Sequence, residues 1–367
     1  MAITERLPLR LRRWSITPGK SGSPPDRSSP KGGVIASIDQ AIKKGVTAST
    51  SDDDHRSDLE GKGPVVVVGG GPAGLRVAEE LVKRKIPVTL LNAERWQPYN
   101  RVKLTPFLAG EVQVGQVYQP VSFGQDAPVK VYTGQRVVAI DRDAKMVVTN
   151  HDRRFVYATL VLCTGSAAHV PNIPGRELSG VYTFRNFDDV EALAARRFRA
   201  RRAVVVGGGL LGLEAARGMA AQKVDTVVVE HMPHLMARQL DDGAGALLDE
   251  RIRQLGVDVR TGVGVKSIEG TDRVEAVTLT SGELVDADTV IICTGVRPHL
   301  KLARDAGLTV DRAVRVDDQL RTNDRDIHAV GECAQHDGHV YGLVSPCLEQ
   351  AAVCAAAIAG EASRYQG

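Results

Sequence analysis

Two glycine-rich turns contain the residues most able to do chemistry. Each turn follows a run of valines and opens a helical pattern, in VVVVGGGPAGLRVAEEL at 65–81 and in VVVGGGLLGLEAARGM at 204–219. In this context the first glycine permits a tight turn, the second lets the backbone approach a pyrophosphate, and the third lets the helix pack on the strand. The sequence therefore predicts two dinucleotide sites, with these glycines at one spacing: Gly69, Gly71 and Gly74, then Gly207, Gly209 and Gly212.

The residue that ends the following strand distinguishes the two nucleotides. In the second copy it is Glu230, whose carboxylate can accept hydrogen bonds from an adenosine ribose and would repel the 2′-phosphate of NADP, so NADH is the expected nucleotide. In the first copy the same position is Asn92, and the nearest acid is Glu94, which we expect to be the ribose ligand there. Two different dinucleotide sites in one chain indicate hydride transfer between two cofactors, and the usual pair is NAD(P)H and FAD.

The elements that must position these residues have a parallel α/β pattern. From Pro64 onward, short β-branched runs alternate with helical periods, and each copy ends in a strand followed by Cys-Thr-Gly, in TLVLCTG and TVIICTG. A further strand, DIHAVGECAQ at 326–335, follows both copies. We expect this strand to return to the first unit, so that the second unit is an insertion in the first.

Residues 1–63 differ from the rest of the chain. They are rich in Ser, Pro, Gly, Arg and Lys and lack sustained periodicity, which predicts a disordered N-terminal extension. The Arg-rich start is also typical of an organellar transit peptide, and this alternative stays open. Export by a twin-arginine signal is not favoured, because no apolar stretch follows Arg12-Arg13.

Composition excludes several function classes. A net charge of +3 with 25% charged residues and no basic, aromatic-interleaved patch does not favour nucleic acid as a partner. No apolar run approaches the roughly 20 residues of a membrane span. The five cysteines include no Cys-x-x-Cys pair, so we expect neither a metal site nor a disulfide framework. We interpret them as buried thiols in a reducing, cytoplasmic protein.

Several motifs together resemble those of two-dinucleotide flavoproteins. GGGPAG, CTGS, GGGLLGLE, CTGVRP and AVGEC look like the pyridine nucleotide-disulphide oxidoreductase superfamily. PYNRVKLTPFLAGE and GECAQHDGHVYGLVSPCLEQA are most similar to the FAD/NADH module of the NADH-dependent nitrite reductase large subunit, with rubredoxin and ferredoxin reductases next. The resemblance implies an α/β fold with two Rossmann-like domains: an FAD domain formed by residues 64–176 and 297–367, and an inserted NADH domain formed by 177–296. It also implies a C-terminal interface domain, which this sequence lacks.

The resemblance assigns roles to individual residues. The FAD diphosphate would contact the first glycine turn, at Gly69, Gly71, Pro72, Ala73 and Gly74, and the adenine would meet the Val137 backbone. The flavin side would be lined by Arg101, Thr164 and Gly165, with Gly331 and Glu332 reaching the ribityl and phosphate groups. Gly207, Gly209, Gly212 and Gly295 would shape the NADH pocket. Glu214 would orient the nicotinamide carboxamide; the alternative is a solvated carboxylate in the first turn of its helix.

Departures from the superfamily narrow the chemistry. Its disulphide reductases carry a cysteine pair after the first glycine turn, and its NADH oxidases and peroxidases carry a cysteine near RVKLTPFL; this chain has neither. Ferredoxin reductases of this type carry a Leu-Ser-Lys triplet where this chain reads Leu104-Thr105-Pro106, although Lys103 could substitute. The last helix is predicted to start at Ser345-Pro346, with Ser as its N-cap.

These observations predict an FAD-dependent NADH dehydrogenase (diaphorase) that passes electrons to a redox protein or partner subunit. One form of this prediction is the electron-input subunit of a nitrite or nitrate reductase system, working as an oligomer or in a hetero-complex. Two alternatives stay open: a stand-alone rubredoxin or ferredoxin reductase, and a non-catalytic FAD-binding assembly subunit.

Overall fold

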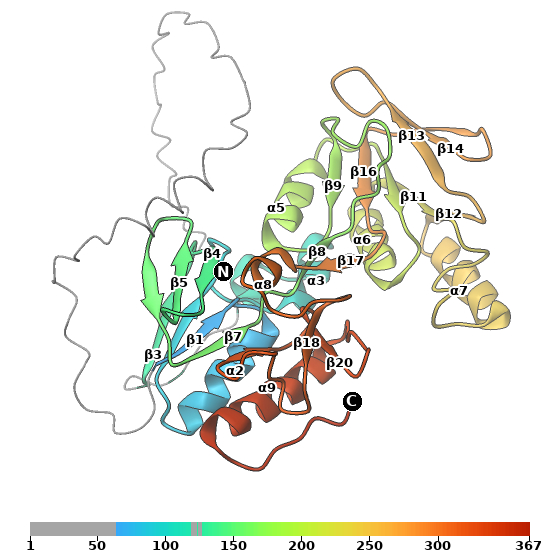
Figure 1. Ribbon diagram of the computed structural model, residues 1–367. Helices are drawn as coiled ribbons and strands as arrows, with labels where there is room; N and C mark the ends of the chain where they lie inside the picture. The colour runs from blue at the N-terminus through green and yellow to red at the C-terminus, as the bar shows by residue number, and fades with distance from the viewer. Residues whose placement is uncertain (1–63, 119–122, 124–126) are drawn as a thin grey trace, which may run out of the picture. The chain divides into compact units, whose positions relative to one another are not determined.

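A computed structural model describes residues 64–118, 123 and 127–367 (Figure 1). The predicted disordered extension at 1–63 lies outside this range. Within it, the valine run that precedes each glycine turn forms the central strand of a parallel sheet.

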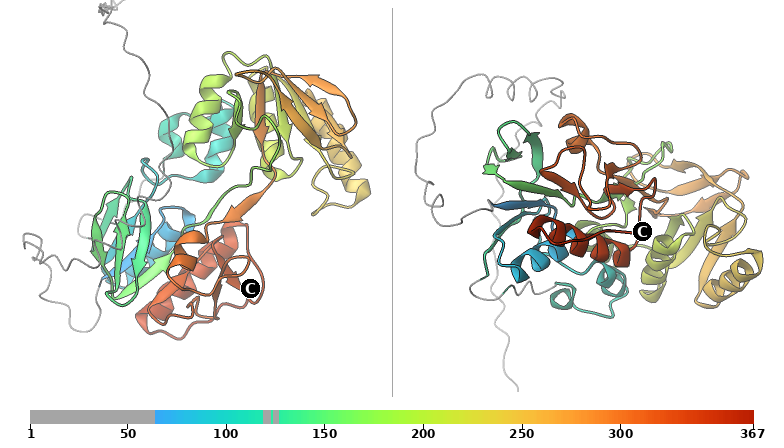
Figure 2. Two further views of the ribbon diagram at one scale, coloured as in Figure 1. Left: turned by 45° about the horizontal axis from the view of Figure 1, so that its top comes forward. Right: turned by 60° about the horizontal axis from the view of Figure 1, so that its bottom comes forward.

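The first sheet has five parallel strands in the order β19-β7-β1-β2-β3. Numbered along the chain, its strands are β1 (Val65–Val68), β2 (Val88–Leu91), β3 (Val129–Tyr132), β7 (Thr159–Leu162) and β19 (Ile327–Ala329). Helices α2 (Pro72–Lys83) and α9 (Val344–Ala359) pack side by side on one face (Figure 2). A three-stranded antiparallel sheet packs on the other face: β4 (Val137–Asp141), β5 (Met146–Thr149) and β6 (Arg154–Val156).

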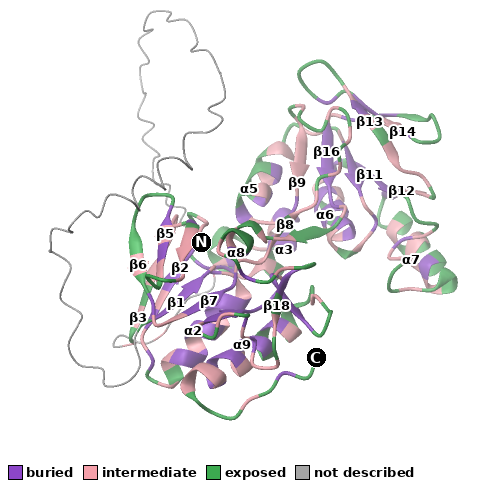
Figure 3. Ribbon diagram, viewed as in Figure 1, coloured by how far each residue is buried: buried purple, intermediate pink, exposed green. Residues whose placement is uncertain are grey.

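The alternation of strand β1 explains why it is valine throughout. Val65 and Val67 belong to the buried cluster formed with the helices, whereas Val66 and Val68 belong to the cluster formed with the antiparallel sheet. Successive side chains of a strand point to opposite faces, so a strand covered on both faces must be apolar at every position. Figure 3 shows the central strands β1 and β7 as buried.

The second sheet repeats this plan in the order β12-β11-β10-β16-β9, again with parallel strands. Its strands are β9 (Val181–Thr183), β10 (Arg202–Val206), β11 (Asp225–Glu230), β12 (Val257–Thr261) and β16 (Thr289–Ile292). The helices of this unit are α5 (Phe187–Arg196), α6 (Leu210–Ala221) and α7 (Asp242–Gln254). Its antiparallel sheet consists of β13 (Val265–Glu269), β14 (Ala276–Leu279) and β15 (Leu284–Asp286).

Two short antiparallel strands, β8 (Ser166–Ala168) and β17 (Val296–Pro298), pair where the chain passes between the sheets. Each of these strands directly follows a Cys-Thr-Gly tripeptide, and we call these two connections the crossings. The backbone N–H of His299 donates to the Gly165 oxygen at 2.9 Å, and the backbone N–H of His169 donates to the Gly295 oxygen at 2.8 Å. The remaining elements near the first sheet are α8 (Lys301–Asp305), β18 (Val314–Val316) and β20 (Ala334–His336).

The segment after β2 packs against helices α5 and α6 of the second unit rather than against helices of the first unit. It contains a 3₁₀ turn, η1 (Arg101–Lys103), and two short helices, α3 (Leu104–Leu108) and α4 (Val114–Val117). Its apolar side chains share one buried cluster with residues of α5 and α6, among them Phe187 and Met219. Four aromatic rings surround Phe187 at centroid distances of 4.7 to 5.7 Å.

The predicted α/β class with two Rossmann-like units is confirmed, and the residue boundaries of the two domains stay a prediction. The predicted start of the last helix is wrong: α9 begins at Val344, with Leu343 as N-cap and no side-chain cap. Pro346 therefore lies at the third helical position, which it tolerates because the first-turn N–H groups have no partner within a helix. Among the described helices, none is long and apolar enough to span a membrane.

Candidate functional site

The two glycine turns have matching geometry. A Cβ added at Gly74 would lie 1.9 Å from the Gly69 oxygen, and one added at Gly212 would lie 1.9 Å from the Gly207 oxygen. Each third glycine therefore permits the helix to pack closely against the turn, as the spacing of the three glycines predicts. A Cβ at the second glycines, Gly71 and Gly209, would meet no heavy atom within 4 Å, so these residues face open space.

Gly71 and Gly209 are also the N-caps of α2 and α6, and no side chain caps either helix. The first-turn N–H groups of a helix need a partner from outside the helix, and together they form a positive end that suits an anion. Open space, uncapped N–H groups and a bare glycine backbone fit a diphosphate at each turn. Pro72, the first residue of α2, fits the same role because its missing N–H would have had no helical partner.

Glu230 lies beside the second turn, where the sequence places a ribose ligand. Its carboxylate accepts hydrogen bonds from the backbone N–H of Gly208 at 2.6 Å and of Met232 at 2.8 Å. The His231 Nδ1 lies 2.8 Å from the same carboxylate. Glu230 is only 8% exposed, so the two backbone bonds fix a buried carboxylate at the end of β11.

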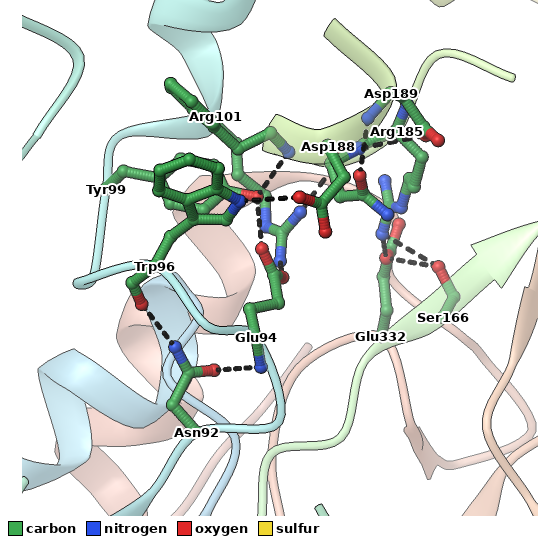
Figure 4. A network of polar contacts seen from close by, with 12 residues as sticks. Asn92, Glu94, Trp96, Tyr99, Arg101, Ser166, Arg185, Asp188, Asp189 and Glu332 are labelled. Carbon is green, nitrogen blue, oxygen red and sulfur yellow. Dashed lines mark hydrogen bonds and ion pairs between the residues drawn. The ribbon is translucent and has the colours of Figure 1, made fainter. Parts of the chain in front are cut away.

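The corresponding strand end in the first unit has different contacts. Asn92 is buried, and its side chain donates to the Trp96 oxygen at 3.1 Å. The Glu94 carboxylate pairs with Arg101 at 2.5 Å and accepts a hydrogen bond from the Tyr99 hydroxyl at 2.7 Å (Figure 4). Burial is the main reason why the pKa of Tyr99 lies well above its usual value, so Tyr99 stays a neutral donor. The role of Glu94 as ribose ligand stays a prediction.

Glu332 follows β19 and lies in a second polar cluster. Its carboxylate accepts a hydrogen bond from Ser166 Oγ at 2.7 Å and forms an ion pair with Arg185 (Figure 4). Arg185 also donates to Ser166 Oγ at 2.8 Å. The neighbouring residue Gly331 has a positive φ of 85°, and its N–H donates to the buried Gln350 side chain at 2.8 Å.

Glu214 lies on α6, in the turn after the glycines, and is half-buried. Its carboxylate accepts a hydrogen bond from Thr105 Oγ1 at 3.2 Å, and Thr105 is buried on α3. The contact joins the helix that follows the second glycine turn to the segment that follows β2. Glu214 thus has a specific partner from the first unit. A freely solvated carboxylate, the alternative role, would have no such partner.

The family described as pyridine nucleotide-disulphide oxidoreductase matches residues 63–356. The chain belongs to this family. It is therefore one of the oxidoreductases that use FAD and NAD(P)H, and the predicted cofactors are confirmed at this level.

Individual relatives agree with the membership. The chain is 37% identical over 312 residues to the nitrite reductase [NAD(P)H] of Bacillus subtilis (strain 168), a match covering 84% of this chain but only 39% of that protein. It is 33% identical to the rubredoxin-NAD(+) reductase of Pseudomonas putida, with 81% of this chain and 80% of that protein covered. Its structure matches that of the covalent putidaredoxin reductase–putidaredoxin complex with a TM-score of 0.78 and 28% identity, covering 83% of this chain and 77% of the other.

The cysteines are all free and buried, as the composition predicts. Burial raises the pKa of each thiol, for example to about 12 at Cys293 and to about 11 at Cys347, so none is a thiolate near neutral pH. In the described part of the chain, no group of three or more His, Cys, Asp or Glu side chains gathers into a metal site.

Sequence reasoning missed four polar partners in these clusters: Tyr99, Thr105, Ser166 and Arg185. Ser166 stands next to a predicted glycine, so its motif offered a signal. Tyr99 and Thr105 lie in the motif PYNRVKLTPFLAGE, but nothing in its pattern indicates their partners, and Arg185 follows an ordinary strand. Among the remaining predicted residues, Val137 begins β4, whereas Thr164, Gly165 and Gly295 lie at the two crossings between the sheets.

Proposed function

We propose that this chain is an FAD-dependent NADH dehydrogenase, or diaphorase, that passes electrons to a separate acceptor. The observation that carries the proposal is that two glycine turns of matching geometry are followed by strands that end in different residues. One has the fixed carboxylate of Glu230 beside it, and the other has the neutral Asn92. Matching turns with different strand ends suit two different dinucleotides, and family membership supports FAD and NAD(P)H as the pair.

Glu230 supports NADH as the preferred donor. Oε2 accepts one hydrogen bond, from the Gly208 N–H, and keeps a lone pair for a ribose hydroxyl, whereas Oε1 accepts the Met232 N–H and also contacts His231 Nδ1. The same negative charge would oppose the 2′-phosphate of NADPH. We therefore place NADH at the turn of Gly207, Gly209 and Gly212, and FAD at the turn of Gly69, Gly71 and Gly74.

Glu214 is the proposed positioning group for the nicotinamide. Its carboxylate can accept hydrogen bonds from the carboxamide, while Thr105 Oγ1 donates to Oε2 of the same carboxylate at 3.2 Å. FAD, when bound, supplies the group that accepts hydride from NADH. The side chains of this chain bind and orient, so catalysis rests on proximity and orientation rather than on a side-chain nucleophile.

The proposed acceptor is a redox protein or a partner subunit that carries nitrite or nitrate chemistry. The similarity to a nitrite reductase supports this choice, although this chain spans about two fifths of that protein. A second candidate is a stand-alone rubredoxin or ferredoxin reductase, supported by the match to four fifths of a rubredoxin-NAD(+) reductase. Saturable reduction of an added rubredoxin or ferredoxin would favour the second candidate. Buried free thiols also fit our proposal of a cytoplasmic location.

Anaerobic rapid mixing tests the proposal. NADH should bleach the visible absorbance of the FAD-loaded protein, and ferricyanide should restore it over repeated turnovers. A flavin that stays oxidised with excess NADH would refute the dehydrogenase. Tight FAD binding with negligible ferricyanide reduction would instead favour a non-catalytic FAD-binding assembly subunit.

A further inference from the structure

Arg185 connects the two units through its side chain. It lies between β9, the edge strand of the second sheet, and α5, yet its guanidinium pairs with Glu332, which follows β19 of the first sheet. Nη2 also donates to Ser166 Oγ, which itself donates to Glu332. Three polar side chains from three separate stretches of the chain thus form a closed triangle.

The backbone of Arg185 is fixed as well. Its N–H donates to Asp189 Oδ2 at 2.9 Å, and its oxygen accepts a hydrogen bond from Arg101 Nη1 at 3.1 Å. Arg101 in turn pairs with Glu94, so the Arg185–Glu332 and Arg101–Glu94 ion pairs are linked through the Arg185 carbonyl oxygen. These two bonds hold the main chain at the point from which the guanidinium reaches Glu332 and Ser166.

Burial makes the ion pair consequential. The side chains of Arg185 and Glu332 are 22% and 19% exposed, so neither charge is fully solvated. The Nε of Arg185 is buried and has no hydrogen-bond partner among the described residues. A carboxylate left here without its cation would be poorly solvated and would stand where negatively charged phosphate groups of FAD are proposed to lie.

We propose that Arg185 is a positioning residue for FAD that acts through Glu332: it neutralises this carboxylate and fixes its orientation toward the ribityl and phosphate groups. The inference rests on the proposed placement of FAD. It assigns an FAD-binding contribution to a residue that follows β9, the edge strand of the proposed NADH-side sheet. FAD affinity thereby depends on a contact between the two units.

Titration of the apoprotein with FAD, followed by flavin fluorescence, tests the inference without any turnover. Arg185→Gln should raise the FAD dissociation constant roughly 10-fold to 100-fold, the range expected when a charged hydrogen-bond partner is lost. Adding Glu332→Gln to that variant removes the unpaired carboxylate. The double variant should then bind FAD at least about threefold more tightly than Arg185→Gln alone.

Arg196→Gln is the matched control. Arg196 lies on α5, has a side chain that is 25% exposed and pairs with Asp288 at 3.2 Å, away from Glu332. This variant should bind FAD like the unaltered protein. If Arg185→Gln melts early, Arg185→Lys keeps the charge and should bind FAD more tightly than Arg185→Gln at equal thermal stability.

The outcomes separate this inference from the proposed function. If Arg185→Gln binds FAD like the control, or if Glu332→Gln fails to improve binding in the Arg185→Gln background, the inference is overturned. Either result leaves NADH oxidation by the unaltered protein untouched. If the unaltered protein binds FAD but does not oxidise NADH, the proposed function fails while the binding comparison still decides the role of Arg185.

Discussion

Neutralising Glu230 should change which nicotinamide nucleotide the protein accepts. The Glu230→Gln variant keeps the length of the side chain and one oxygen acceptor but removes the negative charge. Two unit charges about 4 Å apart repel by about 1 kcal/mol in water and about 4 kcal/mol at an effective dielectric constant near 20. The Glu230 side chain is 10% exposed but stands beside an open nucleotide turn, so we take a value on the order of 2 kcal/mol against the 2′-phosphate.

This repulsion corresponds to a gain of about 30-fold in kcat/KM for NADPH when the charge is removed. For NADH, kcat/KM should fall about tenfold, because a ribose hydroxyl loses a hydrogen bond to a charged acceptor. The amide also cannot accept hydrogen bonds from both Gly208 and Met232, so the melting temperature should drop by a few degrees. Steady-state ferricyanide reduction with each nucleotide measures the ratio, and thermal unfolding measures the stability change.

Asp225→Asn provides the control at the opposite end of the same strand. Asp225 is exposed and pairs with Arg202 at 3.1 Å, so its neutralisation should leave the NADH-to-NADPH ratio unchanged. A Glu230→Gln variant whose ratio stays within about threefold of the unaltered protein would refute the reasoning. In that case the 2′-phosphate would not approach this carboxylate, and NADH preference would need another origin.

Three further results are expected. Glu214→Gln should slow flavin reduction by NADH about tenfold in stopped-flow experiments, with unchanged FAD content. Thr105→Val should slow it less, because Thr105 acts only through its hydrogen bond to Glu214. Equal reduction rates in both variants and the unaltered protein would contradict the positioning role of Glu214. Gly71→Ala should fold normally, since its Cβ meets no protein atom, but should lose FAD because that Cβ occupies the space proposed for the diphosphate. Gly74→Ala should lower the melting temperature, because its Cβ clashes with the Gly69 oxygen. Apoprotein melting and FAD titration check both expectations. Burial lowers the pKa of His328 to about 4, below the value of about 6.5 in the unfolded chain. As pH falls from 7 to 4 the unfolded state binds a proton before the folded state does, so the free energy of unfolding should fall by about 3 kcal/mol. Urea unfolding of His328→Gln should show a correspondingly weaker pH dependence.

Much of the fold was predictable because the repeat carries its own context. A valine run, a glycine turn and a helical pattern at equal spacing leave few alternatives to a Rossmann-like unit, and the described structure contains two such units. The position of Glu230 was predictable for the same reason, because the end of β11 lies next to the turn in this topology.

The polar partners were not predictable, because they depend on which segments the fold brings together. Nothing local in the segment after β2 indicates that it packs against α5 and α6, and this packing is what places Thr105 beside Glu214. Arg185 likewise follows an ordinary edge strand. Its pairing with Glu332 requires the first sheet's strand β19 to be in place, a contact between residues far apart in the sequence.

Asn92 and Glu230 occupy equivalent strand ends in the two units but make different contacts. Asn92 donates its amide to the Trp96 oxygen, so it fixes the following loop instead of presenting a charge to a ribose. That loop places the carboxylate two residues later, at Glu94, where Arg101 and Tyr99 each engage one of its oxygens. Each oxygen keeps a lone pair, so a ribose contact is compatible with both bonds. If Glu94 binds the ribose, it does so while holding Arg101, and FAD affinity and the position of Arg101 should then change together in any variant of Glu94.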